Sequence, residues 1–170
     1  MKTQRIEQYL RRYGISKTRP LIALSLDGIQ QVVVIPVLAE KSSLFRTLAS
    51  IARNPSGDLR STLVICVVNN YPPHLAAKEE INDNQETIEI LKTLVFERGR
   101  LSACPNDLKN DLRQIGDSDL RLAFVDASSP GREFPERSGG VGTARKMGMD
   151  AALGLIDTDA GRGGVICCLD

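Results

Sequence analysis

The sequence has a single histidine and almost no net charge, and each scarcity excludes a class of function. With His74 alone, no metal site built from several histidines can form, and its place after two prolines predicts an exposed loop residue. A net charge of +1 argues against a general binder of nucleic acid, because such proteins usually carry a strong basic excess. We therefore expect no nucleic-acid partner.

Long apolar runs are also missing. No run approaches the roughly 18 apolar residues of a membrane-spanning helix, and residues 1–7 lack the apolar core of a signal peptide. The four cysteines show no zinc-ligand spacing: Cys66, Cys167 and Cys168 lie in apolar runs, and Cys104 precedes a proline. We expect reduced, mostly buried thiols in a cytoplasmic protein, with any membrane association made through parts outside these residues.

What the sequence does contain is an ordinary globular composition with four apolar, strand-like runs. At 170 residues, 42% hydrophobic and 25% charged, the chain fits one domain with a sizeable core. Continuous apolar runs are typical of strands buried on both faces, which indicates a parallel sheet under helices. The expected strands cover residues 32–35, 63–68, 122–125 and 165–169. With the helical patterns between them, they predict an α/β fold with a mostly parallel sheet flanked by helices.

Local signals predict where some of these elements begin and end. Pro36 ends the first strand, and Ser42 or Ser43 caps the helix that follows it. Asn84 caps a later helix, and another helix begins after Pro105. These boundaries rest on residue types alone.

Two regions stand apart from the alternation of strands and helices. Residues 1–30, with a helix at 3–13 and an extended segment at 21–26, are expected to form an N-terminal appendage. Residues 31–170 form the α/β domain. Their stretch 75–115 is longer than a simple crossover needs, so we interpret it as a helical insertion.

A glycine-rich turn precedes the last helix. Glycine occupies positions 139, 140 and 142, and the apolar pattern of an amphipathic helix follows at once. Arg145 and Lys146 then fall in the expected first turn, where the helix dipole disfavours cations. This predicts a bound anion, with phosphate as the obvious candidate. The alternative is a flexible loop that leads into a surface helix whose Arg and Lys are solvated.

Polar side chains follow the expected strands. Residues 36–40, Asn69, Asn70, Asp126 and Asp170 each stand at the carboxyl end of a strand. In open α/β sheets, ligands bind outside those ends, and the glycine-rich turn reaches the same edge. We therefore expect the turn and the strand-end side chains to converge on one site.

Four segments, in this order along the chain, resemble the family 2 glycosyltransferases. Val32–Glu40 is similar to the opening strand of that family, and Leu63–Asn70 to its second strand, whose end holds the nucleotide base. Gly140–Gly148 resembles the family's Gly-x-x-x-Ala-Arg-Asn-x-Gly segment, and Val165–Asp170 resembles the strand that delivers an Asp-x-Asp metal motif. The resemblance covers most of residues 31–170 and implies a GT-A fold.

The resemblance further implies a UDP- or GDP-sugar donor. Pro36, Ala39 and Glu40 would flank its base and ribose. Asn69, with Asn70 beside it, would replace the base-contacting acid that is common in the family, which leaves the identity of the base open.

The same resemblance assigns the diphosphate and a metal ion. Gly142 and Arg145 would approach the diphosphate or base, and Asp170 would be the first acid of the metal motif. Mg²⁺ or Mn²⁺ is implied, since such an ion usually takes one or two carboxylates plus substrate phosphates and acts as a Lewis acid on the leaving group. Lys146 departs from the pattern, because the family often has Asn there.

The chain stops at Asp170, before the second metal acid, the acceptor half and the catalytic base of the family. We therefore expect the donor-binding part of a longer, inverting glycosyltransferase of the hexosyltransferase type, which moves a sugar to an acceptor hydroxyl. No catalytic residue is expected in this chain, and we expect it to be inactive alone. A truncated sheet would also expose an edge that can pair with a second copy to form a homodimer.

Other functions stay open. A nucleotidyltransferase shares the sheet topology, but its glycine-rich loop follows the first strand, where residues 37–40 contain no glycine. A dinucleotide-binding dehydrogenase meets the same objection. The missing second metal acid favours a non-catalytic nucleotide-binding module only if Asp170 is the encoded end of the protein. Single residues also have structural alternatives: Pro36 can merely end a strand, Glu40 can be a solvated carboxylate, Asp126 can be structural, and residues 69–73 have the composition of a turn.

Overall fold

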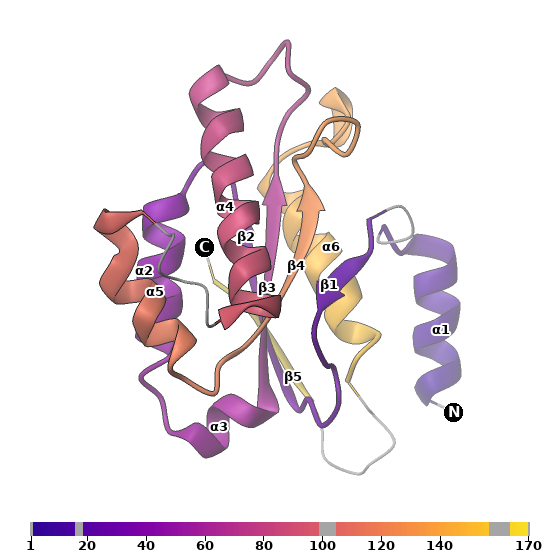
Figure 1. Ribbon diagram of the computed structural model, residues 1–170. Coiled ribbons are helices and arrows are strands. Elements are labelled where there is room, and N and C mark those ends of the chain that lie inside the picture. The colour runs from indigo at the N-terminus through magenta and orange to yellow at the C-terminus, as the bar shows by residue number, and fades with distance from the viewer. Residues whose placement is uncertain (1, 16–18, 99–104, 157–163, 170) are drawn as a thin grey trace.

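The computed structural model describes residues 2–15, 19–98, 105–156 and 164–169. Its strands form one five-stranded sheet in the order β1-β4-β3-β2-β5, with helices on both faces (Figure 1). The strands are β1 (Leu21–Ala23), β2 (Gln31–Val37), β3 (Thr62–Asn69), β4 (Arg121–Ala127) and β5 (Val165–Cys168). The α-helices are α1 (Lys2–Tyr13), α2 (Lys41–Ile51), α3 (Ser56–Ser61), α4 (Lys78–Phe96), α5 (Lys109–Gly116) and α6 (Val141–Leu153). Short 3₁₀ helices, η3 (Asn106–Leu108) and η4 (Glu136–Ser138), precede α5 and α6.

The sheet is mostly parallel. β2 pairs in parallel with both β3 and β5, and β3 pairs in parallel with β4, while β1 adds antiparallel to β4 at one edge. β3 is buried along its whole length because helices pack against both of its faces. That double burial is the reason for its continuous apolar run. The predicted α/β fold and its four predicted strands are confirmed.

The helices divide between the two faces according to the order of the crossovers. α2 lies between β2 and β3 in the chain, and α4 lies between β3 and β4. Both helices pack on one face of the sheet, and α5 packs against α2. α6 connects β4 back to β5 and packs on the opposite face, against β2, β3 and β5. Side chains of β3 alternate between the two apolar cores: Cys66 and Val68 face α2 and α4, while Ile65 and Val67 face α6.

The predicted end of the first strand is wrong, because Pro36 lies inside β2, opposite Val67. A proline is tolerated there because the described part of β5, the neighbouring strand on one side, does not use the N–H that proline lacks. The Val34 carbonyl, two residues earlier, accepts from the Leu169 N–H on the β5 side, so the N–H that Pro36 lacks would point to that side too. The ladder between the described parts of β2 and β5 ends at Val34, and Pro36 therefore breaks no hydrogen bond of that ladder.

Two predicted helix caps are also wrong. α2 begins at Lys41 with Glu40 in the capping position, so Ser42 and Ser43 lie inside the helix and do not cap it. α4 begins before Asn84, whose side chain bonds to neighbouring loops instead of to its own helix terminus. Residue types that favour capping also suit other polar contacts, and tertiary structure decides between the two uses.

Both segments, 1–30 and 75–115, belong to the fold: the first adds a strand to the sheet, and the second adds a helix that packs on it. Residues 21–23 of the expected appendage pair with residues 123–125 as an edge strand. Within the expected insertion, α4 packs against β3 and β4 and forms the crossover between them, whereas α5 packs outside, on α2. The long connection thus contains an ordinary crossover helix plus one additional helix.

Candidate functional site

The strand order changes direction at β2, and this reversal marks where a ligand would bind. From β2 the chain steps outward to β3 and β4, and α6 then carries it back to β5 on the other side of β2 (Figure 1). In open α/β sheets, ligands bind outside the carboxyl ends of the strands at such a reversal. The predicted residues after β2 and β3 lie at this carboxyl edge, and α6 starts from it because it follows the end of β4.

One side chain, Asn84 of α4, joins the loops at this edge, and it is fully buried. Its Oδ1 accepts from the backbone N–H of Ala39, after β2, at 2.8 Å. Its Nδ2 donates to the Asn69 carbonyl at 3.1 Å and to Oδ1 of Asn70 at 2.6 Å, at the end of β3. The Asn70 amide donates in turn to the carbonyl of Ser128, after β4. The network therefore spans three strand ends.

Ala39 has an uncommon backbone conformation, with φ of 53°. A residue with a Cβ rarely adopts this left-handed region. Such strain costs about 1–3 kcal/mol and persists only where the surrounding structure imposes it. The hydrogen bond to Asn84 fixes Ala39 in place. This turn leads from β2 into α2 and leaves Glu40 exposed at the start of that helix. Pro36, half-buried, lies on the face that α6 covers, because Val34 does.

Asn69 has the most unusual environment of the predicted site residues. It is 1% exposed, and neither Nδ2 nor Oδ1 of its side chain has a hydrogen-bond partner among the described residues. Side chains alternate along β3, so Asn69 lies on the same face as Val67, which α6 covers. A buried polar group without a partner costs about 1–3 kcal/mol. Such groups are rare in native proteins and indicate a missing partner, such as a ligand or an ordered water.

The glycine-rich turn packs against Tyr71, which follows the end of β3. A Cβ at Gly139 would lie 2.9 Å from Cε1 of Tyr71. Gly140 has φ of 107°, a conformation that glycine alone adopts readily. Packing and backbone conformation thus explain these two glycines without a ligand. Gly142 differs, since no atom beyond its chain neighbours and the adjacent helix backbone lies within 4 Å of a Cβ placed there, and it leaves room for a ligand at the first turn of α6.

The predicted first-turn position of Arg145 and Lys146 is wrong, because they are the fifth and sixth residues of α6. Nζ of Lys146 lies 2.6 Å from Oδ2 of Asp150 and 2.8 Å from the carbonyl of Tyr13 in α1. Burial opposes the charge of Lys146, but hydrogen bonds to Asp150 and Tyr9 outweigh it and raise the Lys146 pKa. Lys146 thus docks α1. Arg145 is half-buried, and its contact with an anion stays a prediction.

Asp126 has a structural role. Its Oδ1 accepts from the backbone N–H groups of Ser128 and Ser129, at 3.1 and 2.9 Å. Its Oδ2 lies 3.8 Å from the guanidinium of Arg132. These contacts shape the loop after β4, as the structural alternative for Asp126 predicted.

No metal centre is evident in the part of the chain that the structure describes. There, no three His, Cys, Asp or Glu side chains gather in a group that could hold an ion. Asp170, the predicted first ligand, lies outside the described residues. Of the carboxylates at this edge, Asp126 is engaged in its own loop, and Glu40 is exposed. The metal stays a prediction that depends on Asp170.

The cysteines differ in environment. Cys66 is buried in β3, and burial raises the pKa of its thiol to about 12. Cys167 is exposed on the edge strand β5, so the prediction of mostly buried thiols is wrong for it, while Cys168 is half-buried. Cys104 lies outside the described residues. His74 is exposed in the loop after β3, as predicted.

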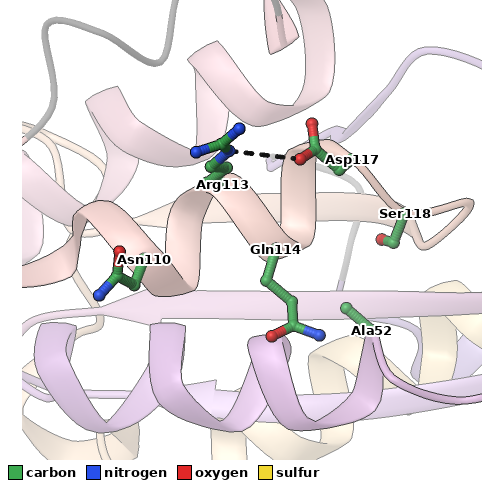
Figure 2. Close-up of a pocket in the computed structure, with 6 residues that line it drawn as sticks. All are labelled: Ala52, Asn110, Arg113, Gln114, Asp117 and Ser118. Carbon is green, nitrogen blue, oxygen red and sulfur yellow. Dashed lines mark ion pairs between the residues drawn. The ribbon is translucent and has the colours of Figure 1, made fainter.

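A cleft of about 430 Å³ lies away from this edge, between α2 and α5 (Figure 2). It is lined by Ala52, Asn110, Arg113, Gln114, Asp117 and Ser118. Gln114 points from α5 toward the end of α2, and Arg113 pairs with Asp117 at 3.6 Å, both side chains being exposed. The end of α2 and the approach to β4 lie at the amino ends of the strands. This cleft therefore lies at the opposite end of the strands from the predicted site.

Comparisons with known proteins do not assign a family. No protein-family model matches the chain, and no curated protein or solved structure matches it.

Two residues at this edge, Asn84 and Tyr71, were not predicted from the sequence. A signal for Asn84 existed, because it lies four and seven residues before Ile88 and Leu91, on the buried stripe of α4. A polar residue on an apolar stripe indicates a buried hydrogen-bond network. Tyr71 has no comparable signal, since its contact with the glycine-rich turn joins segments far apart in the chain.

Proposed function

We propose that this chain binds a UDP- or GDP-linked sugar at the carboxyl edge of β2, as the donor-binding part of a glycosyltransferase of the family 2 type. One observation carries the proposal: the segments that resemble the family surround a single point. The strand that leads to Glu40 is β2, at the reversal, and the strand that ends in Asn69 is its neighbour β3. The helix that carries Arg145 leads to β5, on the other side of β2.

The strand order supports a nucleotide ligand in particular. Among the parallel strands, the first in the chain, β2, is followed outward by β3 and β4, and the next, β5, lies on its other side. Nucleotide-binding α/β folds use this order and hold the ligand at the reversal. A nucleotide bound at the carboxyl end of β2 would be within reach of the carboxyl end of β3 and the start of α6.

Asn69 would recognise the base. An amide both donates and accepts hydrogen bonds, so a base edge with a neighbouring donor and acceptor can satisfy both unpaired atoms. Because Asn69 is 1% exposed, the base reaches it only when the side chains that cover it move aside. Pairing the amide recovers the free energy lost by burying it alone, about 1–3 kcal/mol for each polar group.

The diphosphate would lie at the start of α6. The space around Gly142 lets a phosphate approach the backbone N–H groups of the first turn, where the helix dipole is positive. Arg145 adds a full positive charge close by. Asp170 would hold a divalent ion, whose chemistry when bound is to neutralise the leaving nucleoside diphosphate.

Titration calorimetry with UDP, GDP and their sugar conjugates, with and without Mn²⁺, tests the proposal. We expect the folded chain to bind one of the two nucleotides. Arg145→Met should weaken binding about ten- to hundredfold, because hydrogen bonds to charged groups contribute roughly 1.5–3 kcal/mol. Arg113→Met, at the opposite edge, is the matched control and should leave the affinity unchanged. Absence of binding by a folded chain under all these conditions would contradict the proposal.

A further inference from the structure

Helix α1 lies beside the sheet, outside the helix layers that cover its two faces (Figure 1). Asp150 of α6 holds it: the Tyr9 hydroxyl donates to Oδ1 and the Ile15 N–H donates to Oδ2, both at 3.2 Å. Within residues 4–13, Ile6 and Leu10 are half-buried. The rest of residues 4–13 is exposed, so one side of the helix faces solvent.

Positive charge is concentrated on this helix. Its sequence, KTQRIEQYLRRY, has four basic residues and one acidic residue and therefore a net charge of +3. The whole chain has a net charge of +1, so all other residues together carry −2. Arg5 and Arg12 are exposed. The helix is thus a locally basic, peripheral element, while the remaining residues together are slightly acidic.

Two aromatic rings lie next to these cations. Tyr9 and Tyr13 are 37% and 55% exposed, and their ring centroids are 5.7 Å apart. The Arg12 guanidinium lies 5.3 Å from the centroid of the Tyr13 ring. Tyr9 is four residues from Arg5 and from Tyr13, and three residues from Arg12. The four side chains therefore form one continuous arc of the helix surface around Tyr9.

We propose that this arc, formed by Arg5, Tyr9, Arg12 and Tyr13, docks on a bilayer surface that contains anionic lipid. Arginines attract anionic headgroups, and tyrosine rings favour the interface between headgroups and acyl chains. None of the helices in the described ranges combines the length and apolar character needed to cross a membrane, so the contact is a surface contact. A nucleic acid fits less well, because a short arc with two exposed arginines neutralises few phosphates and the rest of the chain is acidic.

The tyrosines give a direct readout. The chain has no tryptophan and three tyrosines, and two of the three lie on α1, so tyrosine emission mainly reports this helix. The full chain is mixed with phosphatidylcholine vesicles, with and without phosphatidylserine, and with the same vesicles containing brominated lipid as quencher. We expect binding and quenching only where phosphatidylserine is present, and we expect added salt to weaken both.

Two double variants distinguish a specific effect of the arc from an effect of the net charge of the protein. Arg5→Gln with Arg12→Gln should lower vesicle affinity about thirtyfold, because each basic residue near an anionic surface contributes about fivefold. Arg46→Gln with Arg113→Gln removes the same charge from exposed sites on α2 and α5 and should have no effect. Tyr13→Ser should reduce the quenching.

The proposal is overturned if the chain binds neutral and anionic vesicles equally or binds neither. It is also overturned if the control pair weakens binding as much as the α1 pair, or if heparin and RNA bind while vesicles do not. Circular dichroism of each variant checks that it is folded. Docking through α1 does not require the nucleotide site, so nucleotide titration and vesicle binding can succeed or fail separately.

Discussion

The side-chain amide of Asn84 donates to the side-chain oxygen of Asn70 across 2.6 Å, inside the protein. This bond joins the interior of α4 to the residue that follows β3. Through its other contacts, the same amide holds the backbone of Ala39 after β2. The loops that carry the predicted base contacts are therefore positioned by a residue that is fully buried behind them.

Replacing Asn84 by alanine should lower the free energy of unfolding by about 3 kcal/mol, because several buried polar groups at the ends of β2 and β3 lose their partner. Urea denaturation followed by circular dichroism measures this change. The control is Asn110→Ala, an exposed position on α5, which should change the value by less than about 0.5 kcal/mol. Equal effects of the two substitutions would show that the network does not stabilise this edge.

Two glycines of α6 should respond to alanine in opposite directions. A Cβ at Gly148 would lie 2.3 Å from Cγ1 of Val34, so Gly148→Ala should destabilise the fold by about 1–3 kcal/mol through overpacking. Gly142 has open space, and Gly142→Ala should stabilise the helix by up to about 1 kcal/mol. It should nevertheless weaken nucleotide binding by crowding the phosphate. Thermal unfolding and calorimetry measure the two effects, and an unchanged affinity would place the phosphate elsewhere.

Lys146 should stabilise the docking of α1 in a pH-dependent way. Its folded pKa is raised above 10.5, so its contribution is fully present below that value and is lost as the pH rises through the folded pKa. Lys146→Met should therefore lower stability by about 0.5–1 kcal/mol at neutral pH, a small value because the ammonium is partly solvated. The difference from the unsubstituted protein should shrink above pH 10.5. A difference that persists unchanged at high pH would mean that the ammonium charge is not its source.

The thiols should differ in reactivity. Cys167 is exposed and should react with a thiol reagent in the folded protein, whereas Cys66, buried with its pKa raised to about 12, should react only on unfolding. Cys167→Ser should remove the fast reaction at that position, and Cys66→Ser should leave it intact, as peptide mapping of the labelled thiols would show. Fast labelling of Cys66 in the folded state would contradict the burial of β3.

The elements that could be predicted from the sequence are those with a local physical cause. Residues 63–68 had to be apolar throughout because helices cover both faces of β3, and the pattern was visible without knowing its neighbours. Pro36 was mispredicted because its tolerance depends on where the ladder to β5 ends. The first-turn position of Lys146 was mispredicted because α6 begins at Val141, and the partner of Lys146, Tyr13 of α1, lies far away in the sequence. The polar network of Asn84 likewise depends on which loops meet, and no local pattern contains that information.

The most direct test of the nucleotide site is an NMR titration of the ¹⁵N-labelled chain with UDP and GDP. The side-chain amide of Asn69 and the backbone N–H of Gly142 should shift together and saturate with one of the two nucleotides. Asn69→Leu, which removes the unpaired groups, should abolish that binding without loss of stability. If the nucleotides instead shift Gln114 and its neighbours in the cleft between α2 and α5, and leave Asn69 and Gly142 unchanged, the proposed site is wrong.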